Sequence, residues 1–442
     1  MTDTIYAVAT GRGPAGIAVI RMSGPQSRDA LVALTGKPAV PRRAVLRRLH
    51  TPEGGLIDEA LCLWLPGPDS FTGEDGVEFH CHGAASVTTL MLETLARVEG
   101  CRLASAGEFT RRAFLNGRMD LAAVEGLADL IDSETEHQRQ QALRQMMGGL
   151  SREIDQWRLD LLHILALFEA DLDFSDEGDV DGEVSRRARF GLEALRDTMS
   201  LVLAQGDRGE RVREGLTVLL AGPPNSGKST LLNGLARRDV AIVSPVAGTT
   251  RDIVEARLNL DGYAVTVLDT AGLRETDDLV EREGVRRMLA RATSADVVLW
   301  LNSVELPPVS PPEALVRSGV TLISVLTHMD RAPEGTVVGS NLAVSAVTGL
   351  GIDSLVQRIA AFASAEVGTA EEGAVLTRAR HREAVAEALA GIDRALAILH
   401  STQTELVAEE VRLAMRAIGR ITGNVGAEQV LDQVFSHFCI GK

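Results

Sequence analysis

The chain has few cysteines and no long apolar run, and each absence excludes a class of protein. Four cysteines occur among 442 residues, without a Cys-x-x-Cys pair, which argues against a disulfide framework or a structural zinc site. Even the most apolar segment, 159–174, contains several acidic residues, so we expect no transmembrane span. The amino terminus lacks a basic region before an apolar one, so we expect no signal peptide and a cytoplasmic location.

Positive charge is also scarce. The chain has 45 Lys and Arg against 61 Asp and Glu, a net charge of −16, which disfavours indiscriminate binding to nucleic acid. A local basic site remains compatible with this balance. Lysine occurs at only three positions, Lys37, Lys228 and Lys442, so each lysine stands out against the arginines.

Apolar patterning predicts several domains, as the length does. Short apolar runs and turns up to about residue 118 predict a small α+β domain. Helical periodicity follows, then strand-like runs at 216–222, 263–270, 296–302, 320–327 and 341–346 that alternate with helical segments. This alternation predicts a parallel, doubly wound α/β sheet. Helical periodicity returns from Arg378, so the α/β unit is predicted to be inserted into an all-α domain. The acidic segment 169–183 is interpreted as a solvated connector.

The strongest motif is GPPNSGKS at 222–229, which fits G-x-x-x-x-G-K-S between an apolar strand and a helical run. In such a loop the backbone N–H groups of 225–229 surround phosphates at the start of a helix. Lys228 would neutralise the β and γ phosphates, and the Ser229 hydroxyl would bind Mg²⁺. The pattern therefore predicts a nucleoside triphosphate site.

Two further loops indicate a switch GTPase. In LDTAGLRE, at 268–275, Asp269 can hold Mg²⁺ through water and the Gly272 amide can sense a γ-phosphate. AGTTRD at 247–252 offers hydroxyls to the metal. The order of the three loops predicts segments that become ordered around a γ-phosphate. An ATPase remains an alternative, because the usual guanine-reading sequence N-K-x-D is absent.

At the position of N-K-x-D the chain has Thr327, His328, Met329 and Asp330. Asp330 can still accept hydrogen bonds from guanine, whereas Thr327 cannot reproduce an amide and His328 is shorter than a lysine. We therefore expect guanine preference with weakened affinity. The later segment 344–351 would bring the backbone of Ser345 and Ala346 to the base.

Other polar clusters leave two interpretations open. Cys439, near the terminus, is either a small buried side chain or a functional thiol, and its context does not favour prenylation. His80 and His82 share one face of a strand while Cys81 points away, so a satisfied strand is favoured over a metal site. The arginines at 42, 43, 47 and 48 form either a phosphate-backbone contact or a solvated loop.

Taken together, the P-loop, GTTRD, DTAGLRE and the terminal FCIGK resemble the MnmE (TrmE) family of bacterial and organellar tRNA-modification GTPases, in the TrmE-Era-EngA-YihA-Septin-like superfamily. The likeness extends from end to end. It implies a tetrahydrofolate-binding and dimerisation domain, a helical domain in two parts around a Ras-like G domain, and the boundaries 1–118, 119–212, 213–368 and 369–442.

The resemblance implies these nucleotide-binding positions: Asn225, Ser226, Gly227, Lys228, Ser229, Thr230, Ser244, Pro245, Val246, Ala247, Gly248, Thr249, Thr250, Asp269, Thr270, Ala271, Gly272, Asp330, Ser345 and Ala346. Among them it implies K⁺ at Asn225, Ser244, Val246 and Thr249, and Mg²⁺ at Ser229 and Thr250. Catalytic roles fall on Lys228, on Glu281 as the residue that orients water, and on Cys439 with no role assigned. Folate contacts fall on Arg21, Glu78, Arg118 and Lys442, where the family usually has lysine in place of Arg118.

The implied reaction is a modification of the wobble uridine in certain tRNAs. The resemblance implies a K⁺-dependent GTPase homodimer that works in a heterotetramer with an FAD-carrying MnmG-type flavoprotein. Together they would add an aminomethyl or carboxymethylaminomethyl group at C5 with carbon from 5,10-methylenetetrahydrofolate, of which 5-formyltetrahydrofolate is an analogue. The alternatives are an RNA-binding switch in ribosome assembly, which would need neither folate nor Cys439, and a scaffold that no longer hydrolyses nucleotide. Intact Lys228, Asp269 and Glu281 argue against the scaffold.

Overall fold

The structure, a computed structural model, describes residues 3–438 and 441 except 12, 39, 174–180, 239, 243–254, 270–290, 293, 334–335, 337, 340, 369–375, 400–403, 426–430, 432–433 and 436–437. The chain forms two compact units. One contains residues 1–128, 145–188 and 394–442, and the other contains 129–144 and 189–393. Among the described residues, no helix has the length and apolar character needed to cross a membrane.

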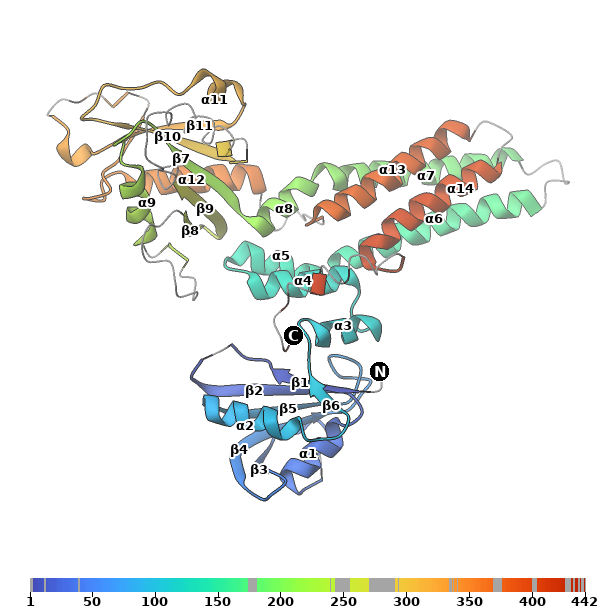
Figure 1. The fold of residues 1–442 in the computed structure, drawn as a ribbon. Coiled ribbons are helices and arrows are strands. Elements are labelled where there is room, and N and C mark those ends of the chain that lie inside the picture. Colours follow the sequence, from blue (N-terminus) through green and yellow to red (C-terminus); the bar gives the residue numbers. More distant parts are fainter. Residues whose placement is uncertain are drawn as a thin grey trace, which may run out of the picture. The chain divides into compact units, whose positions relative to one another are not determined.

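The first unit is built on a six-stranded sheet in the order β3-β4-β5-β2-β1-β6 (Figure 1). Its strands are β1 (Thr4–Val8), β2 (Ala15–Ser23), β3 (Val45–His50), β4 (Leu56–Leu65), β5 (Gly76–Gly83) and β6 (Cys101–Leu103). All neighbours are antiparallel except β1 and β6. Helices α1 (Ser27–Thr35) and α2 (Ala85–Leu95) cover one face, where Ile20, Val77 and Phe79 are fully buried. α3 (Glu108–Leu115) brings Phe109 to the opposite face, against Ile5 and Ala7.

The helices between residues 121 and 214, and those after residue 378, are divided between the two units. They are α4 (Leu121–Asp132), α5 (Glu136–Met146), α6 (Gly149–Asp173), α7 (Asp181–Ala204), α8 (Gly206–Glu214), α13 (Ala379–Ile398) and α14 (Thr404–Thr422). α6 and α14 lie side by side within the first unit (Figure 1). The helices include both ends of the predicted acidic connector, since α6 ends at Asp173 and α7 begins at Asp181. Only 174–180, between them, lies outside the described residues.

The second unit contains a six-stranded sheet in the order β12-β11-β10-β7-β9-β8. Its strands are β7 (Leu216–Ala221), β8 (Glu255–Leu260), β9 (Tyr263–Asp269), β10 (Val297–Ser303), β11 (Thr321–Thr327) and β12 (Leu342–Ala343). Helices α9 (Lys228–Ala236) and α12 (Ile352–Val367) contribute to one apolar cluster of this unit, and α11 (Glu313–Arg317) contributes to another. The core is apolar on both sides of the sheet, as expected for buried parallel strands.

The predicted fold class is confirmed with one correction. The central strands are parallel, but β8 runs antiparallel to β9, so the sheet is not wholly parallel. The reason is a tight turn: Asp261 and Gly262 have φ of 52° and 89°, which lets β8 return directly as β9. The carboxyl ends of β7, β9, β10 and β11 meet at one edge, where ligands bind in doubly wound sheets.

Candidate nucleotide-binding site

The phosphate-binding loop lies between β7 and α9, as the sequence predicts. Its turn needs three residues in the left-handed half of backbone space, Gly222, Asn225 and Gly227, with φ of 148°, 61° and 84°. Gly222 also packs so closely on β10 that a Cβ there would lie 2.3 Å from the Leu301 carbonyl oxygen. Glycine tolerates both the positive φ and the close packing. Asparagine is among the residues that best tolerate a positive φ, which suits position 225. The backbone therefore wraps back onto the start of α9.

Lys228 is held inside this loop and is 9% exposed. Its ammonium donates to the Gly222 and Pro223 carbonyls at 3.0 and 2.8 Å, and to the Ser226 hydroxyl at 3.3 Å. A buried ammonium requires such partners because desolvation penalises an unpaired charge. The loop thus positions one of the chain's few lysines among its own carbonyls, where phosphate oxygens are expected to bind.

Ser229 and Asp269 meet although they are 40 residues apart in the chain. The Ser229 hydroxyl donates to the Asp269 carboxylate at 2.5 Å, and Asp269 is 2% exposed at the end of β9. Two oxygen ligands at one point suit Mg²⁺, which prefers hard oxygen donors and keeps several waters. Among the described residues, no cluster of three His, Cys, Asp or Glu side chains is arranged to hold a metal ion.

The base-reading segment follows β11. The Thr327 hydroxyl lies 2.8 Å from the Ser226 carbonyl oxygen and 3.1 Å from that of Asn302, and so joins this segment to the phosphate loop. Asp330 accepts a hydrogen bond from the Ser345 hydroxyl at 2.6 Å. That bond is the main reason why the pKa of Asp330 lies below its ordinary value. The carboxylate is therefore kept ionised and ready to accept hydrogen bonds.

Ser345 itself is fully buried, and its amide donates to the Leu350 carbonyl at 2.8 Å. Ala346, next in the chain, packs against α9 near Gly234. Thr230 lies in the first turn of α9 with its side chain exposed. Ser345, Ala346 and Thr230 therefore lie at the same edge of the sheet as the phosphate loop, Asp269 and Asp330. The remaining nucleotide, metal and catalytic positions lie outside the described residues, namely Ser244, Pro245, Val246, Ala247, Gly248, Thr249, Thr250, Thr270, Ala271, Gly272, Glu281 and Cys439.

Two of the predicted folate positions, Arg21 and Arg118, lie next to the loop between β4 and β5, and Glu78 pairs with Arg21. Arg21 and Glu78 are register partners on β2 and β5 and form an ion pair at 3.1 Å. The Arg21 guanidinium also lies 5.4 Å from the centre of the Phe71 ring. The Arg118 stem packs beside Gly73, where a Cβ would be 3.3 Å from Cγ. Lys442, the fourth position, lies outside the described residues.

The three histidine and cysteine side chains of β5 do not converge. His80 pairs with Glu78 at 3.2 Å and His82 pairs with Asp58 at 2.8 Å, while Cys81 is buried in the core. Burial raises the pKa of Cys62 to about 11 and that of Cys81 to about 12. Both thiols therefore stay protonated at neutral pH, and neither is a ready nucleophile.

In the arginine cluster, Arg42 donates to the Asp69 carbonyl at 2.5 Å and Arg48 pairs with Glu59 at 3.4 Å.

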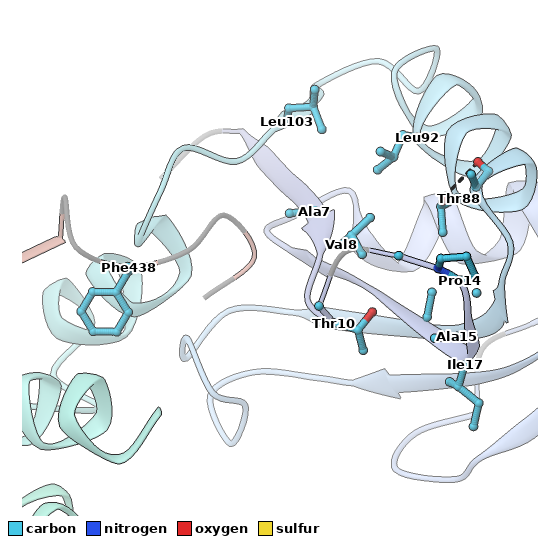
Figure 2. A pocket seen from close by; sticks show the side chains of 15 residues that line it. Ala7, Val8, Thr10, Pro14, Ala15, Ile17, Thr88, Leu92, Leu103 and Phe438 are labelled. Atoms are coloured by element: carbon cyan, nitrogen blue, oxygen red, sulfur yellow. Dashed lines mark hydrogen bonds between the residues drawn. The ribbon is translucent and has the colours of Figure 1, made fainter. Parts of the chain in front are cut away.

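A mostly apolar cavity of about 790 Å³ adjoins the same sheet (Figure 2). The β1–β2 turn, α2 and the carboxyl-terminal segment line it, through residues such as Val8, Pro14, Thr88 and Phe438. Gly441, with φ of 100°, packs directly on the end of β1, where a Cβ would lie 2.2 Å from the Val8 carbonyl oxygen. The carboxyl-terminal segment thus meets the sheet at this cavity.

Sequence reasoning missed two sets of polar residues. Ser303, at the end of β10, bonds the His328 ring at 2.8 Å, and its place at the carboxyl end of a parallel strand was the available signal. Arg112 is fully buried between Asp3 at 2.9 Å, Glu74 at 3.1 Å and Glu108 at 3.2 Å. Two of these carboxylates are distant in sequence, so no local pattern indicated the cluster.

Known proteins resemble the chain over its whole length. The family model of the MnmE helical domain matches residues 121–439, and that of the GTP-binding protein TrmE N-terminus matches 4–118. The chain is 53% identical to the tRNA modification GTPase MnmE of Methylobacterium sp. (strain 4-46), with all of both chains covered. It is 49% identical to the protein of that name from Parvibaculum lavamentivorans, again with all of both chains covered.

Solved structures resemble one part of the chain. Aquifex aeolicus Era bound to GDP·AlF4⁻ is 27% identical, with 34% of this chain and 56% of that one covered and a TM-score of 0.27. The full-length matches and the two family models make the assignment. The chain is a GTP hydrolase and belongs to the MnmE family of tRNA modification GTPases.

Proposed function

We propose that this protein is a K⁺-dependent GTPase that modifies the wobble uridine of certain tRNAs together with an FAD-dependent MnmG-type partner. The pair would add an aminomethyl or carboxymethylaminomethyl group at C5, and tRNA as substrate implies a cytoplasmic location. The observation that carries the proposal is the meeting of Ser229 with Asp269 beside Lys228, in a chain similar throughout to tRNA modification GTPases. Hydrolysis would drive movement of the complex rather than formation of the new bond.

The nucleotide half of the proposal assigns a role to each described residue. The amides of 225–229 would bind phosphate oxygens, and the Lys228 ammonium would exchange its carbonyl partners for them. Ser229, with Asp269 behind it and Thr250, would hold Mg²⁺, while Asn225, Ser244, Val246 and Thr249 would hold K⁺. When bound, these cations supply positive charge to the transferred phosphoryl group. Glu281 would orient the attacking water.

The one-carbon half uses the amino-terminal domain. Arg21, Glu78, Arg118 and Lys442 would bind 5,10-methylenetetrahydrofolate, with the paired Arg21 and Glu78 presenting donors and acceptors to the pterin. Support comes from Gly441, which packs on β1 next to the cavity, because Cys439 and Lys442 flank it in sequence. Burial raises the pKa of Cys62, Cys81 and Cys101, so Cys439 is the cysteine proposed to act.

The remaining assignments concern organisation. We assign residues 1–118 to folate binding and dimerisation, 119–212 and 369–442 to the helical domain, and 213–368 to the G domain. The homodimer would combine with two flavoprotein chains in a heterotetramer. The net charge of −16 agrees with a protein that leaves much of the tRNA contact to its partner.

Reconstitution with a purified MnmG-type flavoprotein tests the proposal. The mixture contains unmodified tRNA, GTP, K⁺, NADH and methylenetetrahydrofolate with a ¹³C one-carbon unit, and the nucleoside products are read by mass spectrometry. We expect the label at C5 of the wobble uridine, and loss of the product with Cys439→Ser. Cys101→Ser is the matched control, because Cys101 lies on β6 and is partly exposed. Unlabelled product, or full activity without folate, would contradict the one-carbon assignment.

A further inference from the structure

His328 occupies a special position in the base-reading segment. It has φ of 58° and ψ of 34°, a left-handed conformation that turns the chain from β11 into Asp330. Its ring lies against the phosphate loop, because a Cβ on Gly227 would be 3.1 Å from Nε2 and 3.3 Å from Cε1. The imidazole is therefore next to Gly227 in space and two residues before Asp330 in sequence.

The hydrogen bonds of Ser303 decide which ring nitrogen carries the proton. The Ser303 hydroxyl oxygen accepts from the Glu305 amide at 3.2 Å and lies 2.8 Å from Nδ1 of His328. Ser303 is 3% exposed, and within the described part of the chain Nδ1 is the one acceptor for its hydroxyl proton. A buried hydroxyl is expected to donate that proton. Nδ1 then accepts, and the neutral ring carries its proton on Nε2.

The nearest charged groups among the described residues lie on the Nδ1 side of the ring. Glu305 is the nearest carboxylate, 3.8 Å from Nδ1, beyond hydrogen-bond distance. Its charge is already paired with Arg331 at 3.1 Å. Nε2 has no hydrogen-bond partner among the described residues, and it lies on the side of the ring that faces the phosphate loop. The structure thus presents a directed N–H donor at the nucleotide site.

We propose that His328 positions the nucleotide by donating an Nε2–H hydrogen bond to an oxygen of its nucleoside half. Gly227 precedes Lys228 and Ser229, which serve the phosphates, whereas Asp330 serves the base. A donor adjacent to both therefore reaches the part of the nucleotide between them. Ser303 acts through His328 by fixing its tautomer. In this way the chain replaces a long cationic side chain with a short, neutral donor.

The experiment measures GDP affinity by calorimetry on the full-length protein with Mg²⁺ at pH 7.5. His328→Phe keeps a flat ring without the donor, while His328→Gln and His328→Lys keep a donor without the ring. The loss of one hydrogen bond predicts about 3- to 10-fold weaker GDP binding for His328→Phe, with both donor variants within about 2-fold of the unaltered protein. His163→Phe, at an exposed position of α6, is the matched control and should bind GDP as before.

A second measurement does not depend on how the His328 variants fold. Imidazole ¹⁵N shifts of histidine-labelled protein should show the Nε2–H tautomer for His328, and Ser303→Ala should convert it to a tautomer mixture. Unchanged GDP binding by His328→Phe, equal losses in all three variants, or an Nδ1–H tautomer would each overturn the proposal. If the unaltered protein bound no GDP, the nucleotide site itself would be wrong, which is a distinguishable result.

Discussion

Thr327 stands where the guanine-reading motif usually has asparagine, and its hydroxyl makes part of the hydrogen bonding that an amide could make. Its hydroxyl has a single proton but lies within hydrogen-bond distance of two carbonyls, those of Ser226 and Asn302. An asparagine amide has two protons and could serve both. The threonine therefore keeps the link between the base-reading segment and the phosphate loop but shares one donor between two acceptors. The expected guanine preference at reduced affinity stays a prediction.

Replacing that hydroxyl tests its contribution. Thr327→Val keeps the shape of the 4% exposed side chain but removes the donor, so it leaves the Ser226 and Asn302 carbonyls without it. We expect a loss of about 1 to 3 kcal/mol in the free energy of unfolding, together with weaker GDP binding. Urea unfolding and calorimetry measure the two effects. Thr198→Val, at an exposed helical position, is the control, and equal changes in both variants would contradict the link.

The Ser345–Asp330 hydrogen bond predicts a pH dependence. It holds the pKa of Asp330 below its ordinary value, so the carboxylate stays ionised as the pH falls, until that lowered pKa is reached. Ser345→Ala removes the donor and lets the pKa rise towards the ordinary value. Since guanine binding needs the ionised acceptor, loss of GDP affinity on acidification should begin at higher pH in the variant. Calorimetric titrations from pH 7.5 down to about 3 measure the shift, because this range spans the ordinary aspartate pKa of 3.8, with Ser318→Ala as the control. If GDP affinity fell over the same pH range in Ser345→Ala and in the unaltered protein, the hydrogen bond would have no such role.

At the scale of elements, α5 is fixed to the β8–β9 turn by ring stacking and to α8 by side-chain amide hydrogen bonds. His137 stacks on Tyr263 with ring centres 4.3 Å apart, at the turn that joins β8 to β9. Gln138 donates to the Arg213 carbonyl at 3.0 Å and Gln141 to the Gly209 carbonyl at 2.8 Å. A Cβ on Gly262 would be 2.9 Å from the His137 ring. The helix and the turn therefore fit closely together.

A double-mutant cycle can measure this fit. His137→Ala should lower the free energy of unfolding by about 1 to 3 kcal/mol, through lost stacking and packing. Gly262→Ala should also destabilise, because of φ at 89° and the clash with the ring. In the His137→Ala background the clash disappears and only the backbone strain remains, so Gly262→Ala should cost less. Additive effects in urea unfolding would show that the turn and the ring are independent.

Element prediction from sequence worked where strands are central and buried. The run 216–222 extends only one residue beyond β7, and the run 263–270 begins where β9 begins. The sequence did not predict β3, β6 and β8, and all three are edge strands. Edges carry charged residues such as Arg47 and Arg48 that interrupt an apolar pattern and protect against unwanted pairing. Their pairing depends on the neighbouring strand rather than on their own sequence.

The residues of the candidate site likewise divide into those that the sequence predicted and those that it did not. Lys228, Ser229, Asp269 and Asp330 were predicted and lie at one edge of the sheet, because each follows a strand whose end the topology fixes. The roles of Ser303 and Arg112 were not predicted, because their partners come from distant parts of the chain. Motif spacing encodes local backbone geometry, whereas side-chain pairing between elements appears only once they are packed.

For the whole molecule, the testable question is whether a monovalent cation couples the nucleotide site to turnover. Asn225 is one of the proposed K⁺ ligands, and its φ of 61° would strain most replacements. Asn225→Gly removes the amide but tolerates that backbone conformation. Asp261→Gly is a matched control, because Asp261 has φ of 52° in the turn between β8 and β9. The two variants make the same kind of change in backbone freedom at different sites.

Turnover of GTP and ATP is then compared in KCl and in NaCl at equal ionic strength, for the unaltered protein and both variants. We expect stimulation by KCl that is confined to GTP and lost in Asn225→Gly, while GDP affinity falls by less than about 10-fold, the effect of one lost hydrogen bond. Asp261→Gly should keep the stimulation. Selectivity for GTP would mean that Asp330 suffices to choose the base despite Thr327 and His328. Equal rates in both salts would remove the potassium assignment but leave the pairing of Ser229 with Asp269 in place, because neither side chain is a proposed K⁺ ligand.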